Sequence, residues 1–238
     1  MSIDTQRGDP APRLTEKARK TRSRLVEAAL QLTQEVGYER ATMREIAKRA
    51  GTSLGNAYYY FPSKGHLVQS FYRRTHEEHV VGCAEVLATD RTFRGRLLGV
   101  MRAKLATIRP YHGFSMALFR AAADTDSPLN PFSDASGPTR REAIALFAEL
   151  VAGSRERIPV EFAEELPELL WLYHMGVLLF WIHDKSPQQQ RSLALVEQTV
   201  PLIASLVAAA SLPGLGAIRK QIQALLHSLR PEPKAARG

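Results

Sequence analysis

The sequence is poor in cysteine and contains no long uninterrupted apolar run. Cys83 is the single cysteine, so the chain cannot form an internal disulfide, which agrees with a reducing cytoplasm. The apolar stretch from Leu169 to Ile182 is interrupted by His174 and is shorter than the roughly 20 residues that a bilayer requires. The start of the chain is polar and lacks the apolar segment of a secretory signal. We therefore expect a cytoplasmic protein with no membrane contact.

Patterns typical of β-strands are also missing. The sequence has no hairpin signal and no strict apolar and polar alternation longer than a few residues, whereas apolar residues recur at helical spacing. Hydrophobic residues make up 45% and charged residues 24%, which excludes wholesale disorder. At roughly 150 residues per domain, 238 residues correspond to one large domain or two small ones. The sequence predicts an all-α protein.

The positive charge is concentrated near the N-terminus. Residues 1–74 hold 14 Lys and Arg against 7 Asp and Glu, whereas residues 75–238 hold 18 against 17. Nearly all of the net charge of +8 therefore lies in the first third of the chain. Such a region attracts a polyanion such as DNA or an anionic surface.

Helical periodicity and capping residues divide the chain into about ten helices. Thr42 and Glu45 form a capping box, Thr52 or Ser53 caps a short helix, and prolines at 167 and 201 bend two long ones. The expected helices cover residues 15–36, 42–50, 53–60, 64–87, 91–108, 113–123, 138–156, 160–184, 187–212 and 215–229.

We expect two folded domains between two disordered ends. Residues 1–14 and 231–238 are rich in proline or charge and are expected to be disordered. Residues 15–62 form the first domain and residues 63–230 the larger second one. Within the second domain, the segment from Asp124 to Gly137 holds two prolines and is long for a connection between helices. Loops of this kind often line or gate a site.

The first three helices have the lengths and the Gly-containing turn of a helix-turn-helix. On the third helix Ala57 and Phe61 lie four residues apart and can face inward. The opposite face carries Asn56 and Tyr59, with Ser53, Gly55 and Tyr60 at its edges. Asparagine can pair with adenine in the major groove, small residues permit close approach, and tyrosines can contact phosphate. Lys64 combines a positive charge with exposed helix amides and could clamp a phosphate.

Residues 51–64 read Gly-Thr-Ser-Leu-Gly-Asn-Ala-Tyr-Tyr-Tyr-Phe-Pro-Ser-Lys, and this segment resembles the DNA-binding signature of the tetracycline-repressor (TetR) family. The resemblance covers roughly residues 20 to 75, about a quarter of the chain. Three positions depart from the pattern: Thr52 stands where the family usually has Val, Ala57 where it has Leu or Ile, and Gly65 where it has Glu. Looser packing under the third helix is expected from the first two.

The resemblance implies an all-helical homodimer with an N-terminal helix-turn-helix DNA-binding domain and a larger C-terminal domain for ligand binding and dimerisation. Family members usually repress transcription from an inverted-repeat operator and are released by a small molecule. Carried onto this sequence, the positions that typically face phosphate are Thr42, Tyr58, Tyr60 and Lys64. The positions that can reach bases are Arg44, Gly55, Asn56 and Tyr59.

The second domain holds two strongly apolar helical segments. Residues 169–182 are apolar all the way round and must be covered on every side. Residues 187–212 are similarly apolar, so two such helices from each subunit could form a four-helix dimer interface, with Gly176 allowing close approach. The alternative is that both segments belong to the core of one subunit.

Bulky and adaptable side chains in this domain are candidates for an effector pocket. They are Phe114, Met116, Phe119, Trp171, His174, Met175 and Leu178. A planar or lipophilic small molecule is favoured, because no cluster of basic residues is visible among these candidates. Ordinary core packing is the alternative for each residue.

Catalytic and metal-binding patterns are weak. His76, His79 and Cys83 could share one helical face and bind a metal, although we favour a solvated face. Residues 124–135 lack the Gly and Glu of a calcium loop, and Ser115 has no strand before it and no paired His and acid. We expect no enzyme, no cofactor and no metal. A helical small-molecule-binding or enzymatic protein that does not read DNA remains the alternative function.

Overall fold

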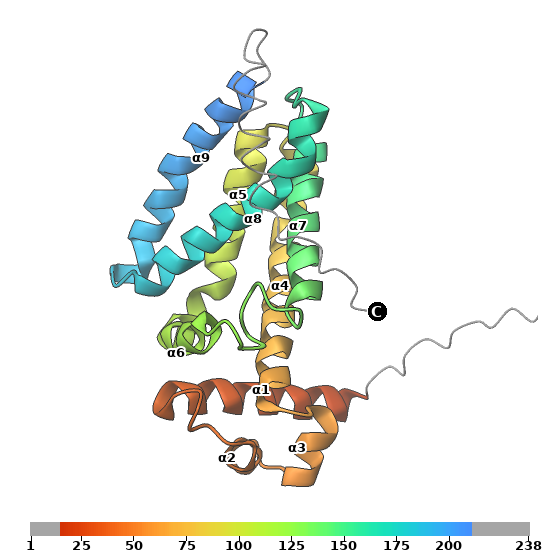
Figure 1. Cartoon of the computed structure of the whole chain (residues 1–238), viewed down its shortest axis with the longest axis vertical. Helices are drawn as coiled ribbons and strands as arrows, with labels where there is room; N and C mark the ends of the chain where they lie inside the picture. The colour runs from red at the N-terminus through yellow and green to blue at the C-terminus, as the bar shows by residue number, and fades with distance from the viewer. Residues whose placement is uncertain (1–14, 211–238) are drawn as a thin grey trace, which may run out of the picture. The chain divides into compact units, whose positions relative to one another are not determined.

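The computed structural model describes residues 15–210, and every regular element in this range is helical (Figure 1). The all-α prediction is confirmed for this range. The expected helix at 215–229 and the expected disordered ends at 1–14 and 231–238 lie outside the described residues. The elements are α1 (Glu16–Val36), α2 (Met43–Arg49), α3 (Leu54–Tyr60), α4 (Lys64–Thr89), α5 (Phe93–Ile108), η1 (Arg109–Tyr111), α6 (His112–Ala123), α7 (Gly137–Ala152), α8 (Val160–His183), η2 (Pro187–Gln189) and α9 (Gln190–Ala210).

Internal contacts divide the chain into two compact units between Ser70 and Phe71. This division falls inside α4, which begins in the first unit and ends in the second. The sequence placed the division just before that helix, after Pro62. The first unit contains α1, α2, α3 and the start of α4, and the second contains the remaining helices.

The first unit has a small core to which each of its helices contributes. The side chains of Leu25, Ile46, Ala57 and Leu67 are completely buried. Arg49 of α2 binds Glu35 of α1 through two hydrogen bonds of 2.6 and 2.7 Å. These contacts fix the mutual arrangement of the short helices, which are too short to be stable alone.

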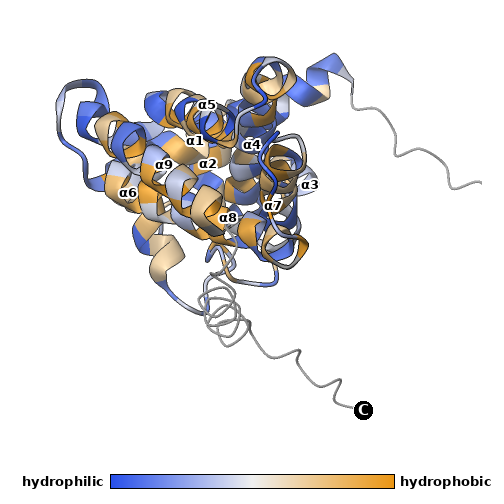
Figure 2. Cartoon of the chain, turned by 90° about the horizontal axis from the view of Figure 1, so that it is seen from above, coloured by the Kyte–Doolittle hydropathy of each residue, from blue (hydrophilic) through white to orange (hydrophobic). Residues whose placement is uncertain are grey.

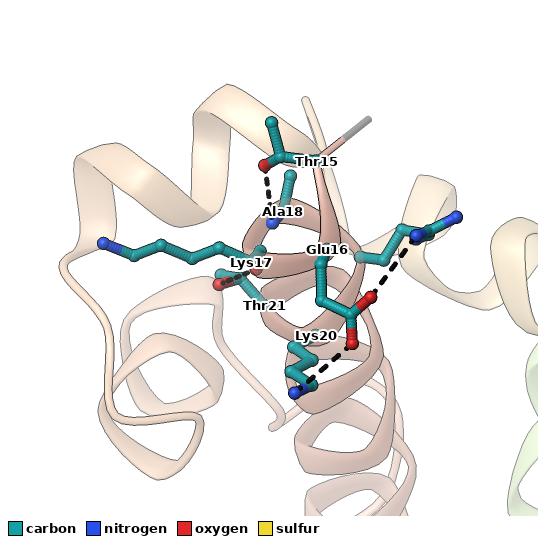
Figure 3. A network of polar contacts seen from close by, with 7 residues as sticks. Thr15, Glu16, Lys17, Ala18, Lys20 and Thr21 are labelled. Carbon is teal, nitrogen blue, oxygen red and sulfur yellow. Dashed lines mark hydrogen bonds and ion pairs between the residues drawn. The ribbon is translucent and has the colours of Figure 1, made fainter. Parts of the chain in front are cut away.

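Caps define the helix ends in the first unit. Thr15 accepts a hydrogen bond of 3.2 Å from the amide of Ala18, and Glu16 pairs with Lys20 in the first turn of α1 (Figure 3). The expected capping box is confirmed, because the Thr42 hydroxyl accepts from the Glu45 amide and the Glu45 carboxylate accepts from the Thr42 amide.

Gly51 closes α2 in a left-handed conformation. Its φ is +63°, a value that side chains disfavour. The Gly51 amide bonds the carbonyl of Lys48, and the Thr52 amide bonds the carbonyl of Ala47. This pair of bonds is a Schellman motif, which ends one helix and sets the direction of the next. Ser53 then caps α3 by accepting a 3.1 Å hydrogen bond from the amide of Asn56.

The second unit is a helical bundle in which α7 packs on α8 and α5 packs on α9. Its core includes the completely buried side chains of Leu97, Val100, Met101 and Leu150, and Figure 2 shows hydrophobic stretches along α8 and α9. Pro167 lies inside α8 and Pro201 inside α9 without ending either helix.

A buried arginine ties three helix ends together in the second unit. The guanidinium of Arg96 on α5 is 2% exposed and donates to the carbonyls of Leu87, Asp90, Glu149 and Leu150. Positive charge at helix C-termini is favourable, and here the carbonyls replace the water that the ion has lost. A Cβ on Gly153 would lie 2.3 Å from this guanidinium.

Two expected helix boundaries in the second unit are wrong. The helix expected over 138–156 ends at Ala152, and Glu156 instead accepts a 2.8 Å hydrogen bond from the amide of Phe93 at the start of α5. The helix expected from Pro187 is interrupted, because Gln188 and Gln189 have φ of 54°. The Asp184 carboxylate caps α9 through the amide and hydroxyl of Ser192.

The segment from Pro187 to Ala209 is long and apolar enough to cross a bilayer by composition alone, with 22% of its apolar window buried within the chain. The sequence pattern marked residues 187–212 as strongly apolar but did not predict an apolar run of bilayer length. One face of α9 carries the buried side chains of Val196, Val200 and Val207. The other carries Leu202 and Leu206, which are 64% and 71% exposed. The helix is therefore apolar on a packed face and on an open face.

Candidate functional site

The helix α3 has one buried and one open face, as the sequence predicted. Ala57 and Phe61 are 0% and 2% exposed, respectively. Tyr59 is 80% exposed and Tyr58 48%, whereas Tyr60 is half-buried and packs edge to face on the Tyr59 ring at 5.1 Å. Most of the Tyr59 side chain is open to solvent, and Tyr60 is the one ring it contacts among the described residues.

Asn56 is held in place by the residue that departs from the family pattern. Its side-chain amide donates a 2.7 Å hydrogen bond to the Thr52 hydroxyl, one turn earlier. The side chain is half-buried. A Val at position 52 could not accept this bond. The bond fixes which edge of the Asn56 amide faces outward.

Gly55 has no partner inside the chain that requires a glycine. A Cβ built at this position meets no atom within 4 Å, and the residue is exposed. Glycine inside a helix costs about 1 kcal/mol relative to alanine. The packing of the first unit does not require a glycine at this position. A molecule that approaches the helix backbone closely from outside would require one.

Two exposed cations lie on the same side of α2. Arg44 and Lys48 are four residues apart, and the side chain of neither forms an ion pair or hydrogen bond within residues 15–210. Sequence reasoning named Arg44 but missed Lys48, although the helical spacing could have found it. Thr42, at the start of this helix, is exposed, and its hydroxyl donates to Glu45 at 2.8 Å. That hydrogen bond is the main reason why the pKa of Glu45 is lowered.

Lys64 does not extend into solvent. Its ammonium donates to the carbonyls of Tyr38 and Glu39 and lies 4.0 Å from the centre of the Tyr38 ring. Burial lowers its pKa. This geometry ties the loop after α1 to the start of α4, so the ammonium is already occupied by protein atoms. The phosphate clamp expected from the sequence would require the ammonium to leave these carbonyls, and it stays a prediction.

Charged side chains also cover the first turns of α1. Figure 3 shows Glu16 pairing with Lys20, while Lys17 stretches away from this pair. A shallow hollow here is lined by Glu16, Lys17, Arg19, Lys20, Thr21, Ser23 and Arg24. The excess positive charge predicted for the first third of the chain thus includes the surface of α1.

The seven residues proposed from the sequence for a ligand pocket fall into separate aromatic groups. Phe114 packs against Phe71 and Tyr111, with ring centres 5.8 and 5.6 Å away. Phe119 packs against His183 at 6.0 Å. Met116, Met175 and Leu178 are half-buried.

Trp171 and His174 are both buried in α8, one turn apart. The segment before α7 contacts this region, because Phe132 is 63% exposed and its ring stands edge to face on Trp171 at 5.4 Å. Within this segment the hydroxyl of Ser133 bonds the Pro128 carbonyl at 3.1 Å. The connection is therefore built from turns and covers one side of Trp171.

His76, His79 and Cys83 do not form a solvated face, and that expectation is wrong. Their exposed fractions are 7%, 2% and 0%, because this side of α4 faces the core of the second unit. Among the described residues, no group of three or more potential His, Cys, Asp or Glu ligands is arranged to hold a metal. The pKa of His79 is lowered to about 3 and that of the Cys83 thiol is raised to about 12, mainly by burial.

These α4 residues meet His174 and Lys104 in the interior. The rings of His79 and His174 stack at 6.3 Å with an angle of 17° between them. His79 donates to the Val100 carbonyl at 2.9 Å, whereas both ring nitrogens of His174 are buried without a hydrogen-bond partner. The charge of Lys104 contributes to lowering the pKa of both histidines. Sequence reasoning missed Lys104, since a lone lysine among apolar residues gives no spatial signal.

Two family models match the chain. The model described as bacterial regulatory proteins, tetR family, matches residues 25–71. The model described as tetracyclin repressor-like, C-terminal domain, matches residues 96–222, which is more than half of the chain.

Curated relatives match the N-terminal region. The HTH-type transcriptional repressor KstR of Mycolicibacterium smegmatis is 41% identical over 63 residues, 26% of this chain and 31% of KstR. The HTH-type transcriptional regulator TtgR of Pseudomonas putida is 37% identical over 67 residues, 28% of this chain and 32% of TtgR. The matched region thus spans about a third of the length of these relatives.

Solved structures resemble the chain over most of its length. FadR from Bacillus subtilis, solved in complex with stearoyl-CoA, has a TM-score of 0.62 at 15% identity. The match covers 77% of this chain and 97% of that one. At this identity the likeness concerns the fold.

Proposed function

Because the chain belongs to the tetracycline-repressor family, we propose that it is a ligand-responsive DNA-binding regulator of transcription. It binds an inverted-repeat operator in the cytoplasm as a homodimer, represses transcription, and is released by a small lipophilic effector. The observation that carries the DNA-binding part is the open face of α3. There, a Cβ on Gly55 would meet no described atom within 4 Å, and Tyr59 is 80% exposed.

The residues proposed to contact DNA divide into two groups. Asn56, Tyr59, Gly55 and Arg44 are placed to approach base edges, because they lie on open or half-open positions of α2 and α3. Contacts to phosphate come from Thr42, Ser53, Tyr58, Tyr60 and Lys48. Lys64 supports this surface by holding the loop after α1.

Exposed apolar stripes on α8 and α9 support a homodimer. Leu172, Leu179 and Phe180 lie on one side of α8 and are 37% to 45% exposed. Gly176 lies on the same side, and a Cβ there would meet nothing within 4 Å. Together with Leu202 and Leu206 of α9, these residues form a surface that a second copy would cover as a four-helix interface.

The second unit supports binding of a small molecule. Trp171 and His174 lie in its interior, and Phe132 covers one side of Trp171. A fold neighbour, FadR of Bacillus subtilis, was solved with stearoyl-CoA. An effector releases DNA only if it binds better to a conformation that reads DNA poorly. The helix α4 is the proposed link, because it belongs to both units.

An electrophoretic mobility shift with the DNA that flanks the protein's own gene tests this proposal. The wild type should shift this DNA at concentrations that leave random DNA free. Tyr59→Ala should weaken the shift and keep the helical content, with Phe132→Ala in the second unit as the control that keeps the shift. A protein that shifts neither DNA, while folded, would favour the alternative of a helical small-molecule-binding protein.

A further inference from the structure

The interior of the second unit contains a positive charge that the chain does not neutralise. Lys104 of α5 is 9% exposed, and its ammonium forms no ion pair or hydrogen bond with any residue in the range 15–210. Burial lowers its pKa to about 8, so the side chain is mostly charged at neutral pH. A buried charge without a partner costs several kcal/mol.

Arg96, on the same helix, is a buried cation whose charge is hydrogen-bonded by the chain. Its guanidinium donates to four carbonyl oxygens at distances from 2.6 to 3.1 Å. Lys104 lies two turns further along α5 and has no such set of acceptors. A structural role therefore explains Arg96 and leaves Lys104 unexplained.

The groups around Lys104 supply no negative charge at neutral pH. His76, His79 and Cys83 of α4 and His174 of α8 face it. The pKa of each histidine is lowered, mainly by burial, and the pKa of the Cys83 thiol is raised, so all four are neutral at pH 7.

The carboxylates on α7 do not neutralise Lys104 either. Glu142 influences the pKa of His76 and Glu149 that of Cys83, but both side chains are exposed and neither contributes to the pKa shift of Lys104. No carboxylate in residues 15–210 therefore forms an ion pair with the ammonium of Lys104.

His174 gives a second and independent sign of a missing partner. It is 6% exposed, and both of its ring nitrogens lack a hydrogen bond. One face of its ring stacks on His79, and Phe147 of α7 lies 5.9 Å away. Leaving buried polar atoms unbonded costs about 1 to 3 kcal/mol. An anionic acceptor bound near both residues would neutralise the ammonium of Lys104 and would bond the one N–H of the neutral His174 ring.

Resting on the function proposed above, we propose that the effector is a monocarboxylate with an apolar body. Its carboxylate pairs with Lys104 and accepts a hydrogen bond from His174, and its apolar part lies among the buried side chains of α5, α7 and α8. One cation matches a single negative charge better than a phosphate dianion, which would leave a buried charge unpaired. The neutral histidines also favour a monoanion over a more highly charged group.

Binding to the full chain without DNA tests this proposal by calorimetry. The probes are hexanoate, decanoate, hexadecanoate, octadecanoate and 3-phenylpropanoate, each beside its methyl ester, together with inorganic phosphate and stearoyl-CoA. At least one acid should bind about 10 to 100 times more tightly than its ester, the range expected for a hydrogen-bonded charge. Pairing with the carboxylate should also raise the pKa of Lys104, so binding at pH 8 should take up about half a proton per site.

Lys104→Met separates recognition from folding. It removes a buried unpaired charge while keeping an apolar side chain of similar length, so the variant should fold at least as stably as the wild type. Acid and ester should then bind equally, and proton uptake should disappear. Lys185→Met changes an exposed lysine after α8 and should keep the preference for the acid.

Three results would overturn the proposal: an ester or stearoyl-CoA that binds as tightly as the best acid, a Lys104→Met variant that keeps the preference, or no binding of any acid. Tighter binding of inorganic phosphate would also exclude the monocarboxylate. A mobility shift with DNA, run on the same preparation, separates this failure from failure of the proposed function. If no acid binds but the DNA shift is intact, only the proposed class of effector is refuted and the proposed DNA-binding function stands.

Discussion

The side-chain amide of Asn56 donates a 2.7 Å hydrogen bond to the hydroxyl of Thr52, one turn earlier in the chain. This bond joins the turn before α3 to the face of α3 proposed to meet DNA. It uses one amide hydrogen of Asn56 and leaves the other hydrogen and the oxygen without a partner among the described residues. The side chain that we propose to read a base is thus held by a residue that need not touch DNA.

Thr52→Val should relax sequence preference at the position read by Asn56. Asn56→Ala should cost about 1 to 3 kcal/mol on the specific site, the usual value of a base contact, and should leave random DNA nearly unaffected. Thr52→Val should cost less and should have no further effect in the Asn56→Ala background. Competition binding with singly substituted operators measures both. Additive losses in the double variant would show that Thr52 acts independently.

Gly55→Ala should separate stability from DNA binding. The new methyl group meets no described atom, and alanine favours a helix more than glycine does. The free energy of unfolding should therefore be about 1 kcal/mol higher in the variant than in the wild type. Binding to specific and random DNA should weaken, because the methyl group stands where close approach is proposed. Denaturation followed by circular dichroism and a mobility shift give the two readouts. Unchanged DNA binding would remove Gly55 from the interface.

Lys64→Ala should weaken folding more than it changes the salt dependence of DNA binding. The ammonium bonds the Tyr38 and Glu39 carbonyls, so its loss should destabilise the first unit by about 1 to 2 kcal/mol. Lys48→Ala is the matched control, because its side chain is exposed and unpaired within residues 15–210.

For Lys48→Ala the salt slope of binding should fall by about two per dimer, at roughly 0.9 per phosphate contact. For Lys64→Ala the slope should stay as in the wild type. A fall in the slope for Lys64→Ala alone would restore the phosphate clamp that the sequence suggested.

Acidification should destabilise the second unit. Burial holds the pKa of His79 at about 3, below its ordinary value of 6.5, so the unfolded chain takes up a proton that the folded chain refuses. The stability that neutral His79 contributes is complete above pH 6.5 and is lost as the pH falls. The loss between pH 7 and pH 5 is about 2 kcal/mol.

Urea denaturation followed by tryptophan fluorescence measures this loss, since Trp171 and Trp181 both lie in the second unit. His79→Gln can keep the donor to Val100 and should reduce the pH dependence by a similar amount. An equal loss in wild type and variant would assign the pH dependence to other groups.

Sequence periodicity predicted the helices well because most begin at a cap or end at a glycine that is readable locally. Thr42, Ser53 and Gly51 act through neighbours within five residues, and their roles are visible in the sequence. Glu156 and Asp184 were misjudged. Glu156 caps α5 from 63 residues away in the chain. Asp184 caps α9 just after Gln188 and Gln189, whose left-handed backbone conformation is not predicted by any sequence pattern.

In the candidate site, too, the features that depend on local helical spacing were predictable, and those that depend on distant residues were not. The inward position of Ala57 and the outward position of Tyr59 follow from helical spacing. The occupied ammonium of Lys64 depends on carbonyls 25 and 26 residues earlier. The cluster around Lys104 joins side chains from separate helices, so neither its burial nor its lack of a carboxylate could be derived from local spacing.

Footprinting of the DNA upstream of the protein's own gene, combined with sedimentation of the complex, tests whether the chain reads DNA as a homodimer. We expect an inverted repeat with half-sites about one helical turn apart and an even number of chains per operator. Leu206→Glu should break the dimer and abolish the footprint while the first unit stays folded. A single unrepeated site occupied by one chain, or a footprint that survives Leu206→Glu and Tyr59→Ala alike, would show that the chain does not read DNA as a homodimer through α3.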